Sequence, residues 1–143
     1  MCLIVAVEVS AAEREQLERA ARAASANGLC VTVDHSVRWP WARQRPVRAS
    51  ISEDATCACS LLSDDADWNA AVWAMRPDVL EPLGRTLELL AAQGPPVIAV
   101  QALWVGERPR EETRVSVSEL ANLARRSQLG TRTRYVVERA VQQ

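Results

Sequence analysis

Apolar and polar residues alternate along this chain in two different periods, which predict strands and helices that follow one another. Runs that are continuously apolar, or apolar at every second position, predict strands over residues 3–9, 29–33, 56–62, 97–105 and 131–137. The runs at 3–9 and 97–105 are almost unbroken, as is typical of strands buried on both faces. The run at 131–137 alternates, and we expect it to form an edge strand.

Apolar residues at three- and four-residue spacing predict the helices between these strands. Helices are expected from Ser10 to Asn27-Gly28, over 63–75, over 78–93 and from Ser116 to near Gly130. Two of them begin with a Ser followed three residues later by a Glu, the capping-box pattern: Ser10 with Glu13, and Ser116 with Glu119. The asparagine and glycine at 27–28 are a typical left-handed helix end.

The predicted order is β-α-β, a long loop, β-α-β, and a short α-β tail. With 143 residues, the chain fits a single domain over residues 1–143. Two β-α-β halves favour an α+β ferredoxin-like sandwich, in which helices cover one face of a mostly antiparallel sheet. A three-layer α/β fold with a mostly parallel sheet is the alternative. The sequence leaves open whether the last strand pairs within its own sheet or across a homodimer.

A loop rich in Arg and Trp is predicted over residues 34–55, with room for a short hairpin. Between 38 and 48 the loop has four Arg, two Trp and no acidic residue. Guanidinium groups neutralise phosphates while indole rings stack on bases, so this composition suits an anionic ligand, a nucleic acid or a protein partner. The candidate binding residues are His35, Arg38, Trp39, Trp41, Arg43, Arg45 and Arg48. In the alternative interpretation, the Trp side chains only anchor the loop to the domain.

Cysteines suggest a second kind of site. Cys57 and Cys59 would share one face of the predicted strand at 56–62, with Cβ atoms roughly 6–7 Å apart. Thiolates that bind one Zn or Cu ion must lie closer, so a metal site here requires a bulge or a turn. Cys2 and Cys30 can join it only if the fold brings them near. The alternative is that these thiols fill the core as small apolar groups.

Acidic residues give a third, weaker candidate. Asp64, Asp65 and Asp67 could bind Mg²⁺ in a carboxylate-dependent enzyme, but capping of the predicted helix at 63–75 is enough to explain them and is the favoured interpretation. The chain has one His and no Lys, and all 17 basic residues are Arg. Few residues are therefore available for acid–base or Schiff-base chemistry, which favours a binding protein over an enzyme.

Charge and hydropathy limit the partners and the cellular location that the sequence predicts. The net charge is −1, so the whole-chain balance does not indicate nucleic acid or membrane partners. No apolar stretch approaches the 18 residues or so of a membrane span, and the first residues lack the basic segment of a signal peptide. We therefore expect a cytoplasmic protein with reduced thiols. The Arg/Trp loop is the leading candidate for its function, and the thiols are the alternative.

Overall fold

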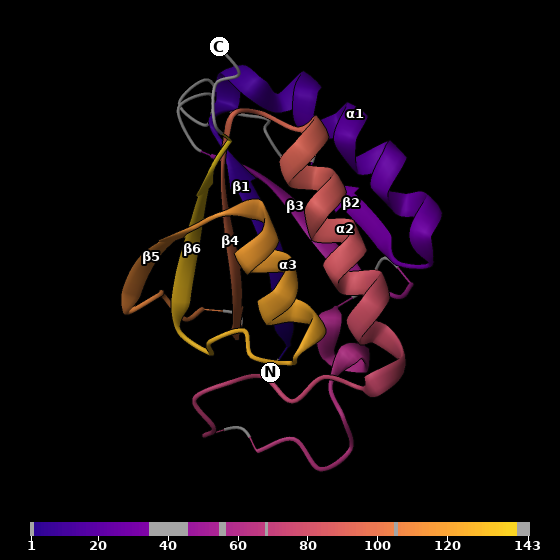
Figure 1. Ribbon diagram of the computed structural model, residues 1–143, viewed down its shortest axis with the longest axis vertical. Coiled ribbons are helices and arrows are strands. Elements are labelled where there is room, and N and C mark those ends of the chain that lie inside the picture. The colour runs from indigo at the N-terminus through magenta and orange to yellow at the C-terminus, as the bar shows by residue number, and fades with distance from the viewer. Residues whose placement is uncertain (1, 35–45, 55–56, 68, 105, 140–143) are drawn as a thin grey trace.

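The computed structural model describes residues 2–34, 46–54, 57–67, 69–104 and 106–139, which form one mixed sheet with helices against it (Figure 1). The strands of the sheet are β1 (Leu3–Val9), β2 (Cys30–Val33), β3 (Val47–Ser52), β4 (Val97–Trp104), β5 (Glu111–Val115) and β6 (Thr133–Glu138). The α-helices are α1 (Arg14–Ala24), α2 (Leu80–Gln93) and α3 (Val117–Arg125). Among the described residues, no helix combines the length and the apolar character that crossing a membrane requires.

The strand order is β2-β3-β1-β4-β6-β5, and β5 with β6 is the parallel pair in an otherwise antiparallel set of pairings. The α+β class is confirmed. The order is not that of a simple ferredoxin-like sandwich, because β6 and β5 continue the sheet beyond β4. The alternative three-layer fold is also not what forms, since α1, α2 and α3 pack on the same face (Figure 1).

The core lies between the helices and one face of the sheet. In β1 the odd-numbered residues, from Leu3 to Val9, belong to this core, and the even-numbered residues point to the opposite face. Leu17 from α1, Leu83 and Leu87 from α2, and Leu120 from α3 are fully buried against them. The helical spacing that predicted these elements therefore reflects burial on one helix face.

Several predicted elements are confirmed with small changes of boundary. They are the strands at β1, β2 and β4, the helix at α2, and the helix at α3. At α3 the Ser116 hydroxyl accepts a hydrogen bond from the Glu119 N–H at 3.1 Å, as a cap should. Gly28 has φ +92°, the left-handed turn that its position predicts. Ser10 makes no such side-chain cap, because a 3-10 turn over Ala11–Glu13 precedes α1.

The middle of the chain departs most from the predictions. Of the strand predicted over 56–62, the described residues 57–62 form no strand; a 3-10 helix, η4 (Ala58–Leu61), stands there instead. The predicted helix over 63–75 is also absent from the described residues: turns occupy this segment, and isolated bridges join Leu62 to Met75 and Val72 to Gly130. Its anchor is Trp73, which is buried and donates its indole N–H to the Ala102 carbonyl oxygen at 3.0 Å.

Two strands were missed and one was misplaced. The predicted loop over 34–55 contains β3, although Val47–Ser52 alternates as a half-buried strand does. No strand was predicted over the charged segment 106–113, which includes the start of β5, whose side chains are mostly exposed. Because β5 adds to β6, the strand expected at the edge lies between β4 and β5. β6 therefore finds both of its partners within its own sheet.

A buried carboxylate ties four strands together on the face opposite the helices. Glu8, 9% exposed, lies on β1 and accepts hydrogen bonds from Arg48 of β3, from Gln101 of β4 at 2.8 Å and from Arg134 of β6 at 2.8 Å. Burial acts to raise the pKa of Glu8, but the hydrogen bonds and charges of Arg134 and Arg48 outweigh it, and the pKa lies below its usual 4.5.

Glu8→Gln should lower the free energy of unfolding at neutral pH by about 2 kcal/mol, since it removes a charged acceptor. The lowered pKa means that Glu8 contributes stability above its usual value of 4.5 and loses it as the pH falls through the folded-state pKa. The difference between the two proteins should therefore shrink in acid. Urea unfolding at a series of pH values from 7 downward measures it.

Glu112→Gln is the matched control, because Glu112 also pairs with Arg134, at 3.3 Å, but its side chain is 63% exposed. It should cost less than about 1 kcal/mol. Equal losses for the two variants, or a Glu8→Gln loss that does not change with pH, would contradict this account.

Candidate metal centre

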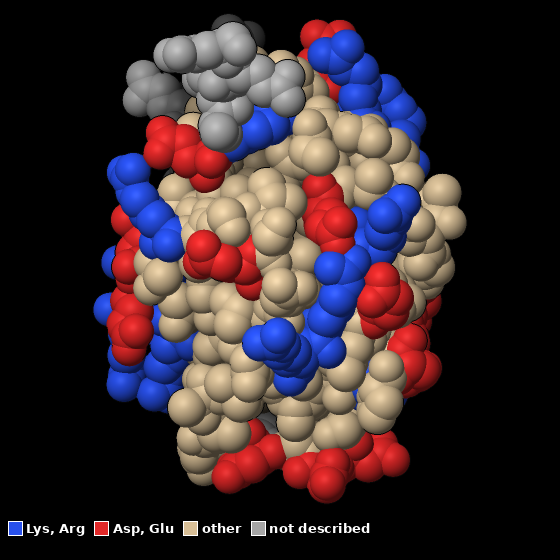
Figure 2. Space-filling model, in the orientation of Figure 1, with Lys and Arg blue, Asp and Glu red and all other residues tan. Residues whose placement is uncertain are grey.

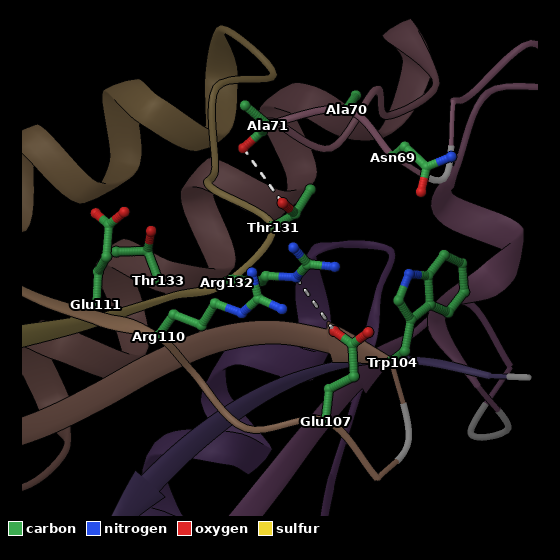
Figure 3. Close-up of a pocket in the computed structure, with 10 residues that line it drawn as sticks. All are labelled: Asn69, Ala70, Ala71, Trp104, Glu107, Arg110, Glu111, Thr131, Arg132 and Thr133. Carbon is green, nitrogen blue, oxygen red and sulfur yellow. Dashed lines mark hydrogen bonds and ion pairs between the residues drawn. The ribbon is translucent and has the colours of Figure 1, made fainter.

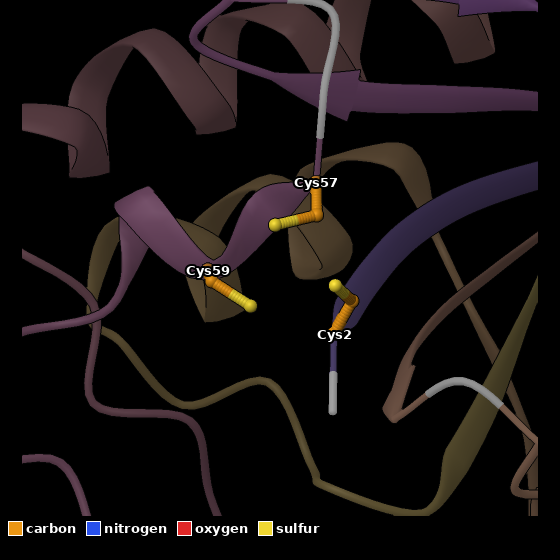
Figure 4. Close-up of side chains that lie close together, drawn as sticks. All are labelled: Cys2, Cys57 and Cys59. Carbon is orange, nitrogen blue, oxygen red and sulfur yellow. The ribbon is translucent and has the colours of Figure 1, made fainter.

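Three of the four cysteine thiols meet at one end of the molecule. Cys2 directly precedes β1, Cys57 precedes η4, and Cys59 lies within η4. Their sulfur atoms all lie within 4.8 Å of one another. Figure 4 shows the three side chains directed into a common space between η4 and the start of β1. We call these residues the cysteine trio.

The turn at η4 brings Cys57 and Cys59 together. A 3-10 helix rises about 2 Å per residue, against about 3.3 Å in a strand, so residues two apart come closer than in the predicted strand. Ala58 and Leu61 are buried in the core and hold η4 in place. The backbone N–H of Leu3 then donates to Cys59 Sγ at 3.1 Å, which connects η4 to β1.

The trio is accessible rather than buried. Cys2 is exposed, and Cys57 and Cys59 are half-buried, with Cys59 packed partly against the core. The alternative in which these thiols fill the interior as small apolar groups therefore does not describe the exposed Cys2, whereas Cys59 does contact the core. The fourth cysteine, Cys30, is half-buried on β2, where its sulfur lies 3.8 Å from the Thr32 hydroxyl, and it is not part of the trio.

Hydrogen bonds inside the trio favour a thiolate at Cys57. The backbone N–H of Cys59 contributes most, followed by the thiols of Cys59 and Cys2, and together they hold the pKa of Cys57 below its usual 9.0. Cys2 responds in the opposite direction: its hydrogen bond to Cys57 and the charge there raise the pKa of Cys2. Of these two thiols, Cys57 therefore loses its proton more readily than Cys2.

The other predicted site residues lie elsewhere. His35, Arg38, Trp39, Trp41, Arg43 and Arg45 fall outside the described residues, so binding of an anion or a nucleic acid by the Arg/Trp loop stays a prediction. Arg48 is described: it lies on β3, and its guanidinium group binds Glu8 while its side chain is 44% exposed.

The predicted acidic site does not assemble. Asp64, Asp65 and Asp67 lie in turns, where Asp67 accepts the Asn69 N–H at 2.9 Å and Asp65 accepts the Ser63 hydroxyl at 2.7 Å. Within the described residues, the cysteine trio is the group in which three metal-ligand atoms converge. Figure 2 shows acidic side chains gathered at the lower end of the face on view, with basic and acidic groups mixed over the rest of it.

Cys2 is the member of the trio that the sequence did not assign. Its participation depends on the packing of η4 against the beginning of β1, more than 50 residues away in the chain, and no local pattern encodes that contact. Neither family models, nor curated proteins, nor solved structures gave a match to this chain. The function must therefore be inferred from the geometry.

In the reduced, metal-free protein, we expect iodoacetamide to modify Cys57 faster than Cys30 at neutral pH. The thiolate is the reactive form, and the pKa of Cys57 is lowered, so more of it is ionised. The advantage should narrow as the pH approaches the usual thiol value of 9.0. Peptide mass spectrometry after short exposures gives both rates in one sample, with Cys30 as the internal control. Equal rates at neutral pH would refute the lowered pKa.

Proposed function

We propose that this protein binds one thiophilic metal ion, zinc or monovalent copper, through the thiolates of Cys2, Cys57 and Cys59. The observation that carries the proposal is the convergence of three sulfur atoms to within 4.8 Å of one another from two separate parts of the chain. Soft thiolate ligands select copper(I) and zinc over hard cations such as magnesium and calcium.

The spacing of the sulfurs suits such an ion. Metal–sulfur bonds of about 2.3 Å place three thiolates around one ion roughly 3.8–4.0 Å apart. From the 4.8 Å limit of the trio, closing the site requires shifts of less than about 1 Å, within reach of side-chain rotation. Cys2, which is exposed and precedes β1, is the ligand that can adjust most easily.

Hydrogen bonds to sulfur support a metal centre over a simple disulfide. The Leu3 N–H donates to Cys59 Sγ, and the Cys59 N–H stabilises a thiolate at Cys57. Donors of this kind orient thiolate ligands and offset their negative charge around a metal ion. A disulfide would use two of the sulfurs and leave the third without a role.

The exposure of the trio suggests an exchangeable ion. Structural zinc sites are closed by four protein ligands, whereas three ligands leave a position for water or another molecule. Cys2 is exposed, so solvent and small molecules can reach the sulfur atoms of the trio. We therefore favour a protein that holds its metal for transfer or reaction over one that uses it only for folding.

We also infer that the first four strands form a ferredoxin-like unit that is extended at one edge. In this unit α1 connects β1 to β2, and α2 connects β3 to β4. Its support is the chain order β1-α1-β2-β3-α2-β4, in which β3 lies between β1 and β2. β5, α3 and β6 then add to the β4 side.

The test is titration of reduced, metal-free protein with Zn²⁺ and, anaerobically, with Cu⁺, each against a chromogenic chelator. One equivalent of at least one ion should bind. Cys2→Ser, Cys57→Ser and Cys59→Ser should each weaken its affinity roughly tenfold or more, since each removes a ligand. Bound metal should also raise the midpoint of thermal unfolding, because the unfolded chain lacks the assembled site.

Cys30→Ser is the matched control, since Cys30 is equally half-buried but lies outside the trio. It should leave metal affinity unchanged. The proposal fails if neither ion competes with the chelator, or if Cys30→Ser weakens binding as much as the changes in the trio do.

A further inference from the structure

A cavity of about 300 Å³ lies where β4 ends and β6 begins. Its walls come from three distant parts of the chain: residues 69–71, the end of β4 with the connection to β5, and residues 131–133. Figure 3 shows Arg110, Arg132 and Thr131 in the middle of these walls, with Trp104 and Asn69 on one side. The volume is at the small end of the range for ligand pockets.

Backbone hydrogen bonds hold the three walls together without any ligand. The Thr131 N–H donates to the Ala71 carbonyl oxygen at 3.0 Å, and the Arg110 N–H donates to the Arg132 carbonyl oxygen at 2.8 Å. Trp104 is 5% exposed and packs edge-on against the buried Trp73, with ring centres 4.9 Å apart. The cavity is therefore preformed, which lowers the entropic cost of binding.

The backbone hydrogen bond between Arg110 and Arg132 places their two guanidinium groups beside each other (Figure 3). Arg132 has a weak ion pair, with its Nε 4.0 Å from the Glu107 carboxylate, and within the described residues the side chain of Arg110 makes no ion pair or hydrogen bond. Glu111 also borders the cavity, but Figure 3 shows its carboxylate pointing away from both guanidinium groups. Two like charges with little neutralisation favour an anion between them.

Neutral donors surround these charges. The hydroxyls of Thr131 and Thr133 and the amide of Asn69 line the same cavity. A guanidinium group presents paired N–H donors that match the oxygens of a phosphate or a carboxylate. Together the arginines and these polar groups can satisfy several oxygens of one bound group.

We propose that this cavity binds the phosphate or carboxylate group of a small molecule through Arg110 and Arg132. A volume of about 300 Å³, walled by three parts of the chain, suits a small ligand better than a polymer. Glu107 acts as an internal competitor, since it occupies Arg132 until the anion arrives. The inference does not depend on the cysteine trio, and either site can exist without the other.

The experiment follows the Nε–Hε signals of Arg110 and Arg132 by ¹⁵N NMR while inorganic phosphate or acetate is added at constant ionic strength. We expect saturable shifts of these signals with at least one anion, and the tighter of the two anions identifies the group that the cavity prefers. Arg110→Gln and Arg132→Gln should each weaken binding about tenfold or more, the effect of losing a charge-assisted contact. Glu107→Gln should instead strengthen it, because it removes the competitor.

Arg114→Gln is the matched control: Arg114 lies on β5, its side chain is 79% exposed, and it pairs with Glu138 rather than lining the cavity. It makes the same change of charge and should leave binding within about twofold. The backbone spectrum of each variant verifies that it is folded. The proposal is overturned if neither anion gives saturable shifts at tens of millimolar, if only a long polyanion binds, or if Arg114→Gln weakens binding as much as Arg110→Gln.

Discussion

The buried carboxylate of Glu8 requires partners from three neighbouring strands, and the native sheet supplies them. A buried charge is costly unless it is paired and hydrogen-bonded, and Glu8 sits on the central strand β1 with 9% of its surface exposed. Its partners arrive from β3, β4 and β6, so the charge is satisfied only when these strands are in their native order. A shift of β1 by one residue would move Glu8 into the apolar core. The interaction therefore selects the register of four strands at once.

That register determines where the candidate chemistry lies. With Glu8 opposite Arg48, Leu3 lies opposite Trp104, and Cys2 directly precedes Leu3 at the beginning of β1. The Leu3 N–H reaches Cys59, while Trp104 forms part of the cavity at Arg110 and Arg132. Both proposed sites thus stand at the same end of the sheet. They are separate in chemistry, since one offers soft sulfur ligands and the other offers guanidinium donors.

The segment between η4 and α2 contributes one wall of the cavity. The predicted helix over 63–75 would have drawn these residues into hydrogen bonds within the helix. Instead, the Trp73 side chain is buried against Trp104. The backbone N–H of Trp73 donates to the Leu129 carbonyl oxygen at 2.9 Å. This packing leaves Asn69, Ala70 and Ala71 as a wall of the cavity. η4, which precedes this segment, carries Cys59 and is preceded by Cys57, and both side chains lie near the start of β1.

Local sequence patterns were sufficient to predict those elements in which buried positions recur at a regular spacing over a few residues. The apolar run of β1, the leucine spacing of α2, the cap at Ser116 and the left-handed Gly28 all appear where periodicity and side-chain chemistry place them. Each depends on residues only a few positions apart, whereas the choice between the α+β class and its three-layer alternative came from the strand pairings.

Only the tertiary structure decided the rest, because the deciding contacts span long distances in sequence. β3 could have been recognised from its alternation, but the exposed β5 gains its strand geometry from β6. Cys57 and Cys59 take their positions from the burial of Ala58 and Leu61, and Cys2 joins them through the packing of η4 on β1. The pairing of Arg110 with Arg132 likewise arises where β5 meets β6. A local sequence pattern does not encode these long-range contacts. Their favourable free energy is gained only after distant segments have been brought together, at an entropic cost that depends on the chain between them.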